Sequence, residues 1–416
     1  MSGNKPKHRI DVAEAAALIL ARMPDWGTMR VPIDTAHGEV LRQTISAERD
    51  QPPFDRVTMD GIAIRHAAIA AGVRSFRVVG TQGAGDDRIS IADDHSCVAI
   101  MTGAALPPGV DTVIPVERIS REGELVSLEH GYQPAAGQFI HRRASDHPQG
   151  TPLLQPGTLI GAAEMAVLTI GGSASVEVAR RPSIAVISTG DELVDVGQPV
   201  SANQIRSSND RAITGALAAR GFRNCTRVHL PDDRPVLERE LRRLLAEEDV
   251  LILTGGVSMG EFDYVPQVLL ALGMELVFHK VLQRPGLPLW FGVSPEGKPV
   301  FALPGNPVSS LVCLVRYALP GLLHAMKLDH CPKPIVTLAE EVRFEPDLTC
   351  FLPVTLEYTA DGRCLARPKQ TNTSGDFAAL AGTAGFVALP RGAAVFPAGY
   401  PASFFSWSIF RASLTT

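Results

Sequence analysis

The sequence predicts a multidomain α/β plus β protein: a doubly wound, mostly parallel α/β domain, β-rich N-terminal lobes and a small C-terminal β-barrel. Three observations predict this class. The chain has 416 residues, the length of roughly three typical domains. Strand-like and helix-like segments alternate between about 182 and 328, as in a parallel sheet covered by helices. From about 329 onward, neighbouring positions alternate between two faces, as they do in strands.

The first element is a predicted helix near the N-terminus. Its apolar residues follow a helical stripe: Val12, Ala15, Ala16, Ile19, Leu20 and Met23. Basic residues precede it, as in a signal peptide, but Asp11 and Glu14 interrupt the apolar segment. We therefore expect an amphipathic helix, with a connector at Pro24–Thr28, and no targeting segment.

Short extended segments separated by Gly and Pro follow at 29–140 and predict β structure with long loops. They are Val40–Thr44, Phe76–Val79, Cys97–Met101, Thr112–Val116 and Leu125–Leu128. Residues 141–180 combine turn sequences with a helix-like stretch, Ala162–Thr169, and a strand-like one, Ser175–Val178. Arg180 and Arg181, followed by Pro182, indicate a domain boundary.

The α/β pattern occupies the next region. The predicted strands are Ile184–Ser188, Thr226–Leu230, Val250–Leu253 and Val300–Leu303, and the predicted helices are 208–220, Arg234–Glu247, 264–272 and one beginning at Pro307. Asn306 before Pro307 is an N-cap signature, and Gly221 closes the first of these helices. In the C-terminal region, Asp361–Gly362 between two strand-like segments predicts a hairpin.

Composition and charge exclude several classes of protein. The net charge is −5, whereas nucleic-acid binders usually carry a basic excess. The six cysteines are scattered without C-x-x-C spacing, which argues against a zinc site and for reduced thiols in the cytoplasm. No uninterrupted apolar segment reaches the length of a membrane span. We expect a cytoplasmic protein that binds neither nucleic acid nor membranes.

Loops rich in Gly and hydroxyl side chains follow three of the predicted parallel strands. They are Ser188–Glu192, Thr254–Gly260 and Leu303–Ser309. Ligands of open parallel sheets bind beyond the carboxyl ends of the strands, where bare glycine backbone can approach an anion. The three loops therefore predict a cradle for a phosphate or another oxyanion, with ordinary structural turns as the alternative.

Acidic residues surround this predicted cradle: Asp191, Glu192, Asp232, Asp233, Glu261 and Asp263. Carboxylates beside a phosphate imply a divalent cation, because they otherwise repel the ligand. Capping and solvation are the alternative, and Asp233 stands where the cap of the 234–247 helix belongs. Lys280 and Arg284 add cationic groups on a further loop, although a lone lysine is ordinarily a solvated surface residue.

One motif points to a different chemistry. Gly256-x-Ser258-x-Gly260 matches the nucleophile elbow of serine hydrolases, with His279, His324 and His330 as candidate bases. No oxyanion-hole motif of the H-G-G-G type precedes it, and the Gly-Gly opening suits an anion cradle better. A hydrolase is the less favoured alternative.

Read together, the motifs resemble the molybdopterin molybdenumtransferase family, the MoeA type that also forms the E domain of gephyrin. The matching segments cover nearly the whole chain: Pro53–Gly61, Met101–Pro107, Asp111–Val113 with Glu117, Arg142–Asp146 with Gly150, Ser188–Leu193, Ser208–Asn209, Gly255–Asp263 and Pro304–Ser309.

The resemblance implies four domains. Residues 1–28 and 141–180 would form a discontinuous elongated domain, 29–140 a β-rich lobe, 181–328 the molybdopterin-binding domain and 329–416 the barrel. It also implies a homodimer whose active cleft lies between the α/β domain and the second domain of the other subunit. The implied activity is insertion of molybdate into adenylylated molybdopterin with Mg²⁺, releasing AMP and molybdenum cofactor. An upstream molybdopterin adenylyltransferase is an implied partner.

Residue roles carry over position by position. The family's functional acids fall on Asp60, Glu192, Asp232 and Asp263, and its functional threonine on Thr102. Glu192 and Asp263 would bind the metal or position molybdate, and Lys280 matches an upstream lysine of the family. The implied cofactor-binding residues are Ser188, Thr189, Gly190, Ser208, Asn209, Gly255, Gly256, Ser258, Pro304, Gly305, Asn306 and Ser309.

The chain departs from the family pattern at a few positions. The usual K-P-G-K-P reads Arg284-Pro285-Gly286-Leu287-Pro288, and Ala99 stands where the family often has arginine. Arg284 keeps the charge but not the geometry of lysine, and Leu287 removes a donor. Two alternatives therefore stay open: a catalytically weakened paralogue that carries or scaffolds molybdopterin, and a tungstate-preferring insertase.

Overall fold

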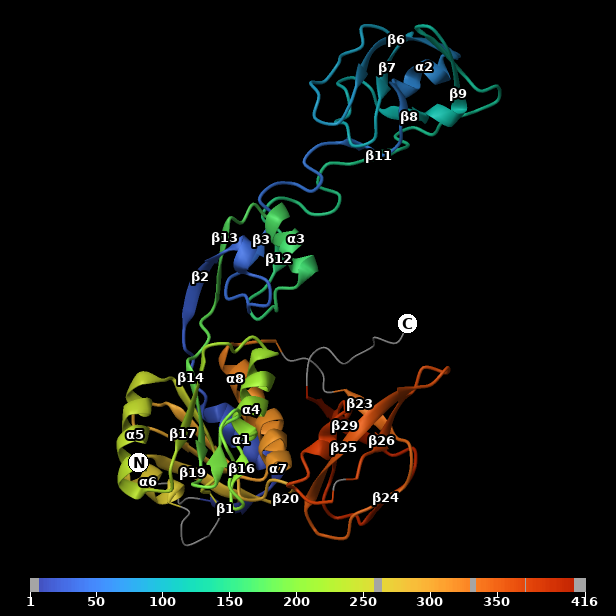
Figure 1. The fold of residues 1–416 in the computed structure, drawn as a ribbon. Helices are drawn as coiled ribbons and strands as arrows, with labels where there is room; N and C mark the ends of the chain where they lie inside the picture. Colours follow the sequence, from blue (N-terminus) through green and yellow to red (C-terminus); the bar gives the residue numbers. More distant parts are fainter. Residues whose placement is uncertain (1–6, 258–263, 330–333, 371, 408–416) are drawn as a thin grey trace.

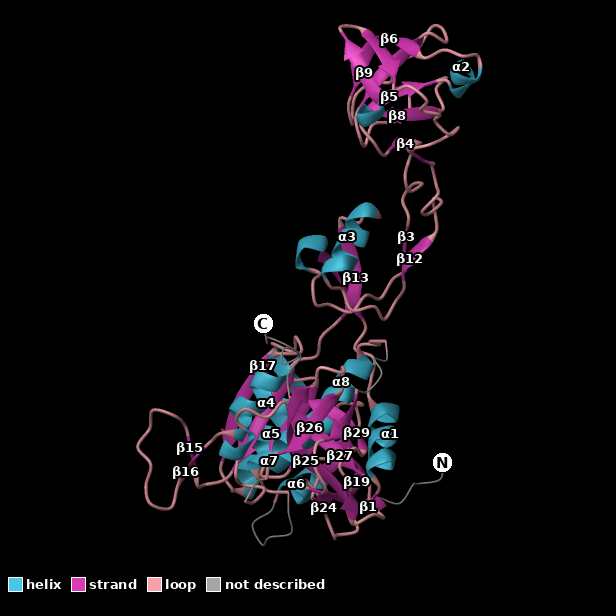
Figure 2. Ribbon diagram, turned by 90° about the vertical axis from the view of Figure 1, so that its right-hand side faces the viewer, coloured by secondary structure: helices cyan, strands magenta, loops and turns pink. Residues whose placement is uncertain are grey.

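The molecule is elongated and consists of four structural units (Figure 1). The computed structural model describes residues 7–257, 264–329, 334–370 and 372–407. A β-rich lobe lies at one end, a small middle unit connects it to the α/β domain, and the C-terminal barrel packs beside the α/β domain (Figures 1 and 2). The chain runs out through the middle unit to the lobe and returns through the middle unit.

A seven-stranded sheet, counted over the described residues, forms the centre of the α/β domain. In sheet order the strands are β1 (Lys7–Ile10), β19 (Glu275–Val281), β21 (Trp290–Val293), β22 (Pro299–Leu303), β18 (Val250–Thr254), β14 (Ile184–Thr189) and β17 (Cys225–Leu230). Neighbours pair in parallel, except that β21 runs antiparallel to β19 and β22. The predicted mostly parallel sheet is confirmed.

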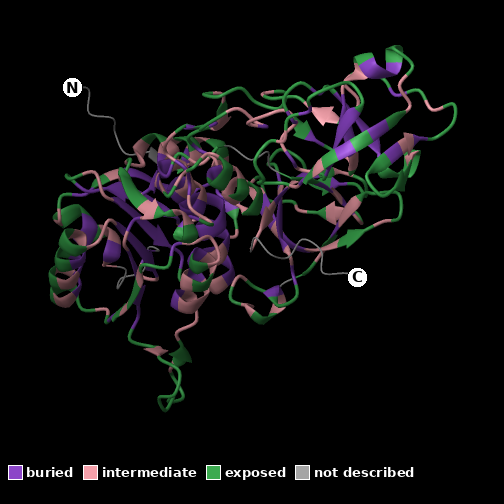
Figure 3. Ribbon diagram, turned by 90° about the horizontal axis from the view of Figure 1, so that it is seen from above, coloured by how far each residue is buried: buried purple, intermediate pink, exposed green. Residues whose placement is uncertain are grey.

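Helices cover both faces of this sheet, as in a doubly wound fold (Figure 3). On one face lie α1 (Val12–Arg22), α4 (Asn209–Ala218), α7 (Pro307–Cys313), the π-helical turn Leu314–Ala318 and α8 (Leu319–Ala325). On the other face lie α5 (Arg234–Glu247) and α6 (Val265–Ala271). The predicted helix Arg234–Glu247 is confirmed as α5, with Leu237, Leu241 and Leu244 on one face, buried against the sheet.

The helical stretch Pro307–Ala325 is, within the described part of the chain, long and apolar enough to cross a membrane. It has a mean hydropathy of 1.4, and 78% of its most apolar window is buried inside the protein. Leu314, Tyr317 and Leu322 belong to the core of the α/β domain. The apolar character of this stretch is thus used in packing against the sheet and α1.

The middle unit is formed by two separate segments of the chain. Its elements are β2 (Thr28–Pro32), the 3₁₀ turn Ile33–Thr35, β3 (Ile45–Ser46), β12 (Pro152–Leu154), α3 (Ala162–Ile170) and β13 (Ser175–Ala179). Strand β2 pairs with β13, and β3 pairs with β12. Each strand of the outgoing segment therefore pairs with a strand of the returning segment.

The lobe contains a six-stranded sheet within the part of the chain that the structure describes. In sheet order its strands are β8 (Thr112–Pro115), β5 (Gly61–Ile64), β7 (Ser96–Ile100), β6 (Ser75–Gln82), β10 (Leu125–Leu128) and β9 (Ile119–Glu122). It also has α2 (His66–Ala70), the 3₁₀ turn Val116–Arg118, and the pair β4 (Arg56–Val57) and β11 (Ile140–His141) at its base. The predicted β-rich lobe is present.

The C-terminal unit is a barrel closed by β25, β26, β23, β29 and β27. Its elements are β23 (Ile335–Leu338), β24 (Val342–Arg343), β25 (Thr349–Tyr358), β26 (Cys364–Pro368), the 3₁₀ turn Ala378–Leu380, β27 (Gly385–Leu389), β28 (Val395–Phe396) and β29 (Pro401–Ser406). The predicted hairpin is confirmed, since Tyr358 pairs with Cys364 across Asp361–Gly362. From the α/β domain, β20 (Gln283–Arg284) pairs with β25 and joins the two units.

Two segments lie elsewhere than the sequence predicted, and one expected strand is not formed. Residues 7–22, expected in the elongated N-terminal domain with the rest of 1–28, belong to the α/β domain, where β1 extends the sheet and α1 packs on α8. Residues 29–46, expected in the 29–140 lobe, belong to the middle unit. The expected strand Val40–Thr44 is reduced to isolated bridges at Val40 and Leu41. Pairing partners far along the chain decide these placements.

Candidate active site

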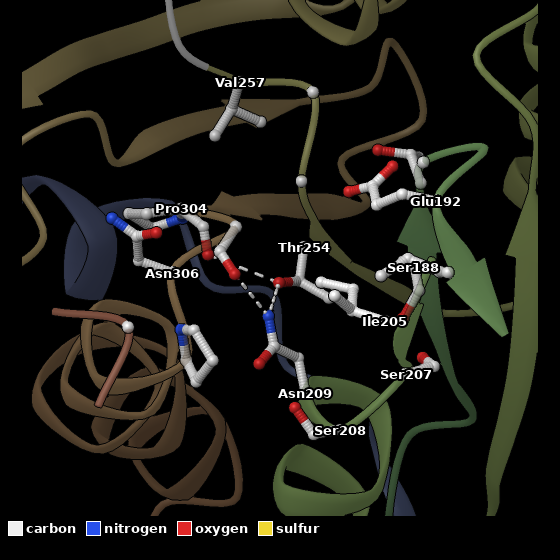
Figure 4. Close-up of a pocket in the computed structure, with 18 of the residues that line it drawn as sticks. Ser188, Glu192, Ile205, Ser207, Ser208, Asn209, Thr254, Val257, Pro304 and Asn306 are labelled. Atoms are coloured by element: carbon white, nitrogen blue, oxygen red, sulfur yellow. Dashed lines mark hydrogen bonds between the residues drawn. The ribbon is translucent and has the colours of Figure 1, made fainter. Parts of the chain in front are cut away.

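A pocket of about 660 Å³ lies at the carboxyl ends of β14, β18 and β22 (Figure 4). Residues from three loops and from the start of α4 line it. Of the twelve predicted cofactor-binding residues, ten line this pocket: Ser188, Thr189, Gly190, Ser208, Asn209, Gly255, Gly256, Pro304, Gly305 and Asn306. Ser309 is buried on α7 behind the wall. Ser258 and Asp263 lie outside the described residues, as does His330.

Asn209 in the first turn of α4 ties two of the loops together. Its side-chain Nδ2 donates to Thr254 Oγ1 and to the backbone oxygen of Gly305, each at 2.8 Å (Figure 4). Thr254 Oγ1 donates in turn to the Pro304 oxygen at 3.3 Å. These bonds hold the Thr254–Gly256 loop against the Pro304–Asn306 loop and give the pocket a fixed floor.

Both the backbone conformation and the close neighbours of Gly255 require a residue without a side chain there. Its φ of +98° lies in the left-handed region, and a Cβ there would stand 2.6 Å from the Thr189 backbone oxygen. Gly256 has a φ of +62°. The two residues let the chain turn sharply after β18, which leaves bare backbone facing the pocket.

Three buried polar atoms at the pocket have no hydrogen-bond partner among the described residues. They are Ser188 Oγ, Thr189 Oγ1 and Asn209 Oδ1. A buried polar atom without a partner costs about 1–3 kcal/mol, so a ligand with polar groups is favoured here. A polar pocket of this kind fits a phosphorylated, heteroatom-rich molecule.

Two carboxylates, Glu192 and Asp232, also line the pocket. Asp233 does not, because its carboxylate caps α5 by accepting from the Val236 backbone nitrogen at 2.8 Å, as predicted. The described residues contain no cluster of three His, Cys, Asp or Glu side chains that could hold a metal. Mg²⁺ is commonly held by one or two carboxylates together with substrate phosphates, and Glu192 with Asp232 fits that donor set.

Comparison with protein families assigns the three parts of the chain. Residues 10–172 match the model of the MoeA N-terminal region (domain I and II), 185–324 match a probable molybdopterin binding domain, and 336–406 match the MoeA C-terminal region (domain IV). The chain belongs to the MoeA family. The pocket lies within the segment that matches the probable molybdopterin binding domain.

Relatives match nearly the whole length of this chain. A molybdopterin molybdenumtransferase of Synechocystis sp. is 39% identical over 96% of this chain and 100% of its own length. One of Staphylococcus aureus is 30% identical over 95% of this chain and 94% of its own. A structure of a molybdopterin biosynthesis MoeA protein from Pyrococcus horikoshii superposes with a TM-score of 0.80 at 25% identity, covering 96% of this chain and 100% of that one.

The remaining predicted residues of this MoeA chain lie outside the pocket lining. Asp60 and Thr102 are together on the lobe, at the opposite end of the molecule from the α/β domain (Figures 1 and 2). Lys280 is half-buried at the end of β19, and Arg284 is exposed on β20 beside the barrel. One chain therefore does not bring all the predicted catalytic residues to the pocket.

Sequence reasoning missed several residues that line the pocket. Ile205 and Arg206 form β16, which pairs with β15 (Leu193–Val194) at the base of an arm that projects from the domain (Figure 2). Gly375 comes from the barrel, whereas Pro288 belongs to the Pro285–Pro288 segment that the sequence had already placed at the pterin site. Gly375 follows a polar Asn-Thr-Ser stretch, which is the one sequence signal for a rim contributed by the barrel.

The expected capping role of Asn306 is wrong. Its side chain makes no cap bond to α7 and instead donates from Nδ2 to Ser374 Oγ at 2.8 Å. The Val308 backbone nitrogen, which a cap would have satisfied, donates to the Ser374 oxygen at 3.1 Å. The barrel thus supplies the cap of α7 and closes one side of the pocket.

Proposed function

We propose that this protein inserts molybdate into adenylylated molybdopterin, releasing AMP and the molybdenum cofactor. The observation that carries the proposal is the pocket of partnerless polar atoms in the segment that matches a molybdopterin binding domain. The name of the full-length relatives, molybdopterin molybdenumtransferase, supports the same reaction class.

Within the pocket, the loop backbone at Gly255, Gly256 and Gly305 faces the phosphate of the pterin, and the Ser188 and Thr189 hydroxyls supply hydrogen bonds. Glu192 and Asp232 would hold Mg²⁺, which supplies charge stabilisation for the phosphoryl group. Molybdate is itself an oxyanion nucleophile, so the reaction needs positioning and electrostatics rather than a covalent protein nucleophile.

A homodimer accounts for the position of Asp60 and Thr102. Because the lobe lies away from the pocket of its own chain, a second copy would have to bring these two residues to the site. This arrangement is the one that the family resemblance implies. A cytoplasmic location and delivery of substrate by a molybdopterin adenylyltransferase complete the proposal.

The direct test is a defined reaction with purified protein, adenylylated molybdopterin, molybdate and Mg²⁺. We expect stoichiometric AMP, measured by chromatography, together with cofactor that activates a molybdenum-free molybdoenzyme. Omission of molybdate should abolish the formation of active cofactor. If saturating substrate binds and neither product appears, the proposed reaction is wrong.

Arg284 and Leu287 favour a second candidate, a weakened paralogue that carries or scaffolds molybdopterin. Restoring both lysines, Arg284→Lys with Leu287→Lys, separates the two functions. A large gain in turnover supports a decayed enzyme, whereas unchanged turnover supports a competent insertase. Parallel reactions with molybdate and tungstate then decide which oxyanion is preferred.

A further inference from the structure

The connection between β19 and β21 is a tight loop that closes around a glutamine side chain. The Val281 and Lys280 nitrogens donate to the Leu287 and Leu289 oxygens, both at 2.9 Å, and so close the loop at its base. Gln283 has no exposed surface. Its Nε2 stands 3.2 Å from the backbone oxygens of both Pro285 and Gly286, so one amide group satisfies the interior of the loop.

The same glutamine is held from the other side by α7 and the π-helical turn that follows it. The Tyr317 hydroxyl donates to Gln283 Oε1, and Cys313 Sγ lies 3.4 Å from Gln283 Nε2. Both partners are fully buried or nearly so, with Tyr317 at 1% and Cys313 at 0% exposure. Burial raises the pKa of the Tyr317 hydroxyl, so it remains a donor at neutral pH.

No room is left for the loop to shift toward the helix. Gly286 has a φ of +94°, and a Cβ there would stand 2.5 Å from Cys313 Sγ and 2.6 Å from Gln283 Nε2. Helix α7, which carries Cys313, begins at the pocket, where Asn306 and Pro307 are part of the lining. One continuous helical stretch, α7 with the π-helical turn that follows it, therefore connects the pocket lining with the loop.

The loop reaches the pocket at its far end. Pro288 lines the pocket, and Arg284 is presented on the exposed side, where β20 pairs with the barrel. The positions of Pro288 and of the Arg284 backbone both depend on how the loop is folded. Gln283 hydrogen-bonds to two carbonyls of this loop, whereas Cys313 Sγ reaches only the Gly286 oxygen.

We propose that Gln283, held by Tyr317, is a positioning residue that fixes the Arg284–Pro288 loop relative to the molybdopterin pocket. This inference rests on the proposed function. Without the amide, the Pro285 oxygen loses this buried partner and the Gly286 oxygen keeps only Cys313 Sγ, at 3.6 Å, so the loop must rearrange to find another donor. A displacement on the order of 1 Å is enough to slow a reaction about 100-fold when positioning matters.

The test replaces Gln283 by leucine, which keeps the approximate size and removes the amide. We expect Gln283→Leu to lower turnover about 10- to 100-fold while the dissociation constant for molybdopterin, measured by fluorescence, changes less than about threefold. Thr383→Val is the matched control, since Thr383 is a buried hydroxyl that accepts from Trp407 Nε1 at 2.8 Å in the barrel. This control should lose stability and keep its turnover.

Two double variants separate positioning from simple stability. Adding Tyr317→Phe to Gln283→Leu removes the hydroxyl that lost its acceptor, so the unfolding midpoint should recover in part while turnover stays low. Adding Gln283→Leu to Arg284→Ala should slow turnover less than Gln283→Leu slows the wild type, because part of the effect of the glutamine acts through Arg284. Tyr317→Phe alone tests the same network if Gln283→Leu does not fold, and a smaller drop in turnover is expected.

The outcomes distinguish this inference from the proposed function. If the wild-type protein forms no AMP and no cofactor, the proposed function fails. If the wild type is active and Gln283→Leu keeps full turnover, or if turnover recovers together with stability in the double variant, the positioning role is wrong. Equal slowing by Gln283→Leu with and without Arg284 would also overturn it.

Discussion

The carboxylate of Asp60 accepts two hydrogen bonds from Thr102, one from its backbone nitrogen at 2.7 Å and one from its hydroxyl at 2.8 Å. The two residues come from different loops of the lobe, at the start of β5 and after β7. The backbone bond, followed by the hydroxyl bond, lowers the pKa of Asp60 below its usual value. A fixed negative charge is thus held on an exposed surface of the lobe.

We predict that Asp60→Asn and Thr102→Ala reduce turnover by about tenfold or more, because both disturb this fixed carboxylate. Thr102→Ser keeps both donors and serves as the control with near-normal turnover. Thermal unfolding of all three variants should match the wild type, since both positions are exposed. Full activity in Asp60→Asn would remove the lobe from the proposed site.

Gly255→Ala should destabilise the protein more than Gly297→Ala. Both glycines have positive φ, +98° and +83°, but only at Gly255 would a Cβ meet backbone, the Thr189 oxygen at 2.6 Å. The left-handed backbone alone costs an alanine about 1–2 kcal/mol, and the clash adds to it at Gly255. Urea unfolding measures the difference, and molybdopterin binding should weaken only in Gly255→Ala. An equal loss of stability in Gly255→Ala and Gly297→Ala would contradict the close approach of Gly255 to the Thr189 backbone.

The ion pair between Arg180 and Asp249 joins the end of the middle unit to the α/β domain, with contacts of 2.9 and 3.2 Å. Burial pushes the pKa of Asp249 up, but the hydrogen bonds from Arg180 and Ser183 outweigh it and hold the pKa below its ordinary 3.8. A lowered folded-state pKa contributes stability above the unfolded value, and this contribution is lost as the pH falls through the folded value.

Asp249→Asn should therefore cost about 1–2 kcal/mol at neutral pH, and the difference from wild type should shrink as the pH falls below 3.8. Urea unfolding of the wild type and of Asp249→Asn, at neutral pH and below pH 3.8, measures this difference in stability. Asp94→Asn removes a more exposed pair, Arg65–Asp94 at 3.0 Å, and should change stability little. A pH-independent cost at Asp249 would show that its charge is not what stabilises the joint.

Glu192→Gln should raise the Mg²⁺ concentration needed for half-maximal turnover, because it removes one of the two described carboxylates of the pocket. Glu238→Gln, on the exposed side of α5, is the control and should leave the metal requirement unchanged. Titration of Mg²⁺ against AMP release measures both. An unchanged requirement in Glu192→Gln would exclude this carboxylate as a metal ligand.

Local signals predicted the elements of the α/β domain and the hairpin well. Asp233 before α5 and Asp361–Gly362 between strands act within a few residues of themselves, so their sequence context is sufficient. Strand β1 was missed because its pairing partner, β19, lies far along the chain. Strands β19 and β21 were also missed, although they pair with each other as near neighbours in the sequence. Asn306 was misjudged because its competing partner, Ser374, belongs to another unit of the fold.

The position of the first strand limits the order in which the parts of the chain can fold during synthesis. In the finished sheet Ile10 pairs with Val281, and the α1 side chains Ala15 and Ile19 are buried in the core that includes α8. On the ribosome these N-terminal residues emerge long before their partners are made, while the lobe and the middle unit can already close on themselves. A nascent chain that stops before β19 thus presents α1 with its apolar face uncovered, as a target for chaperones and proteases.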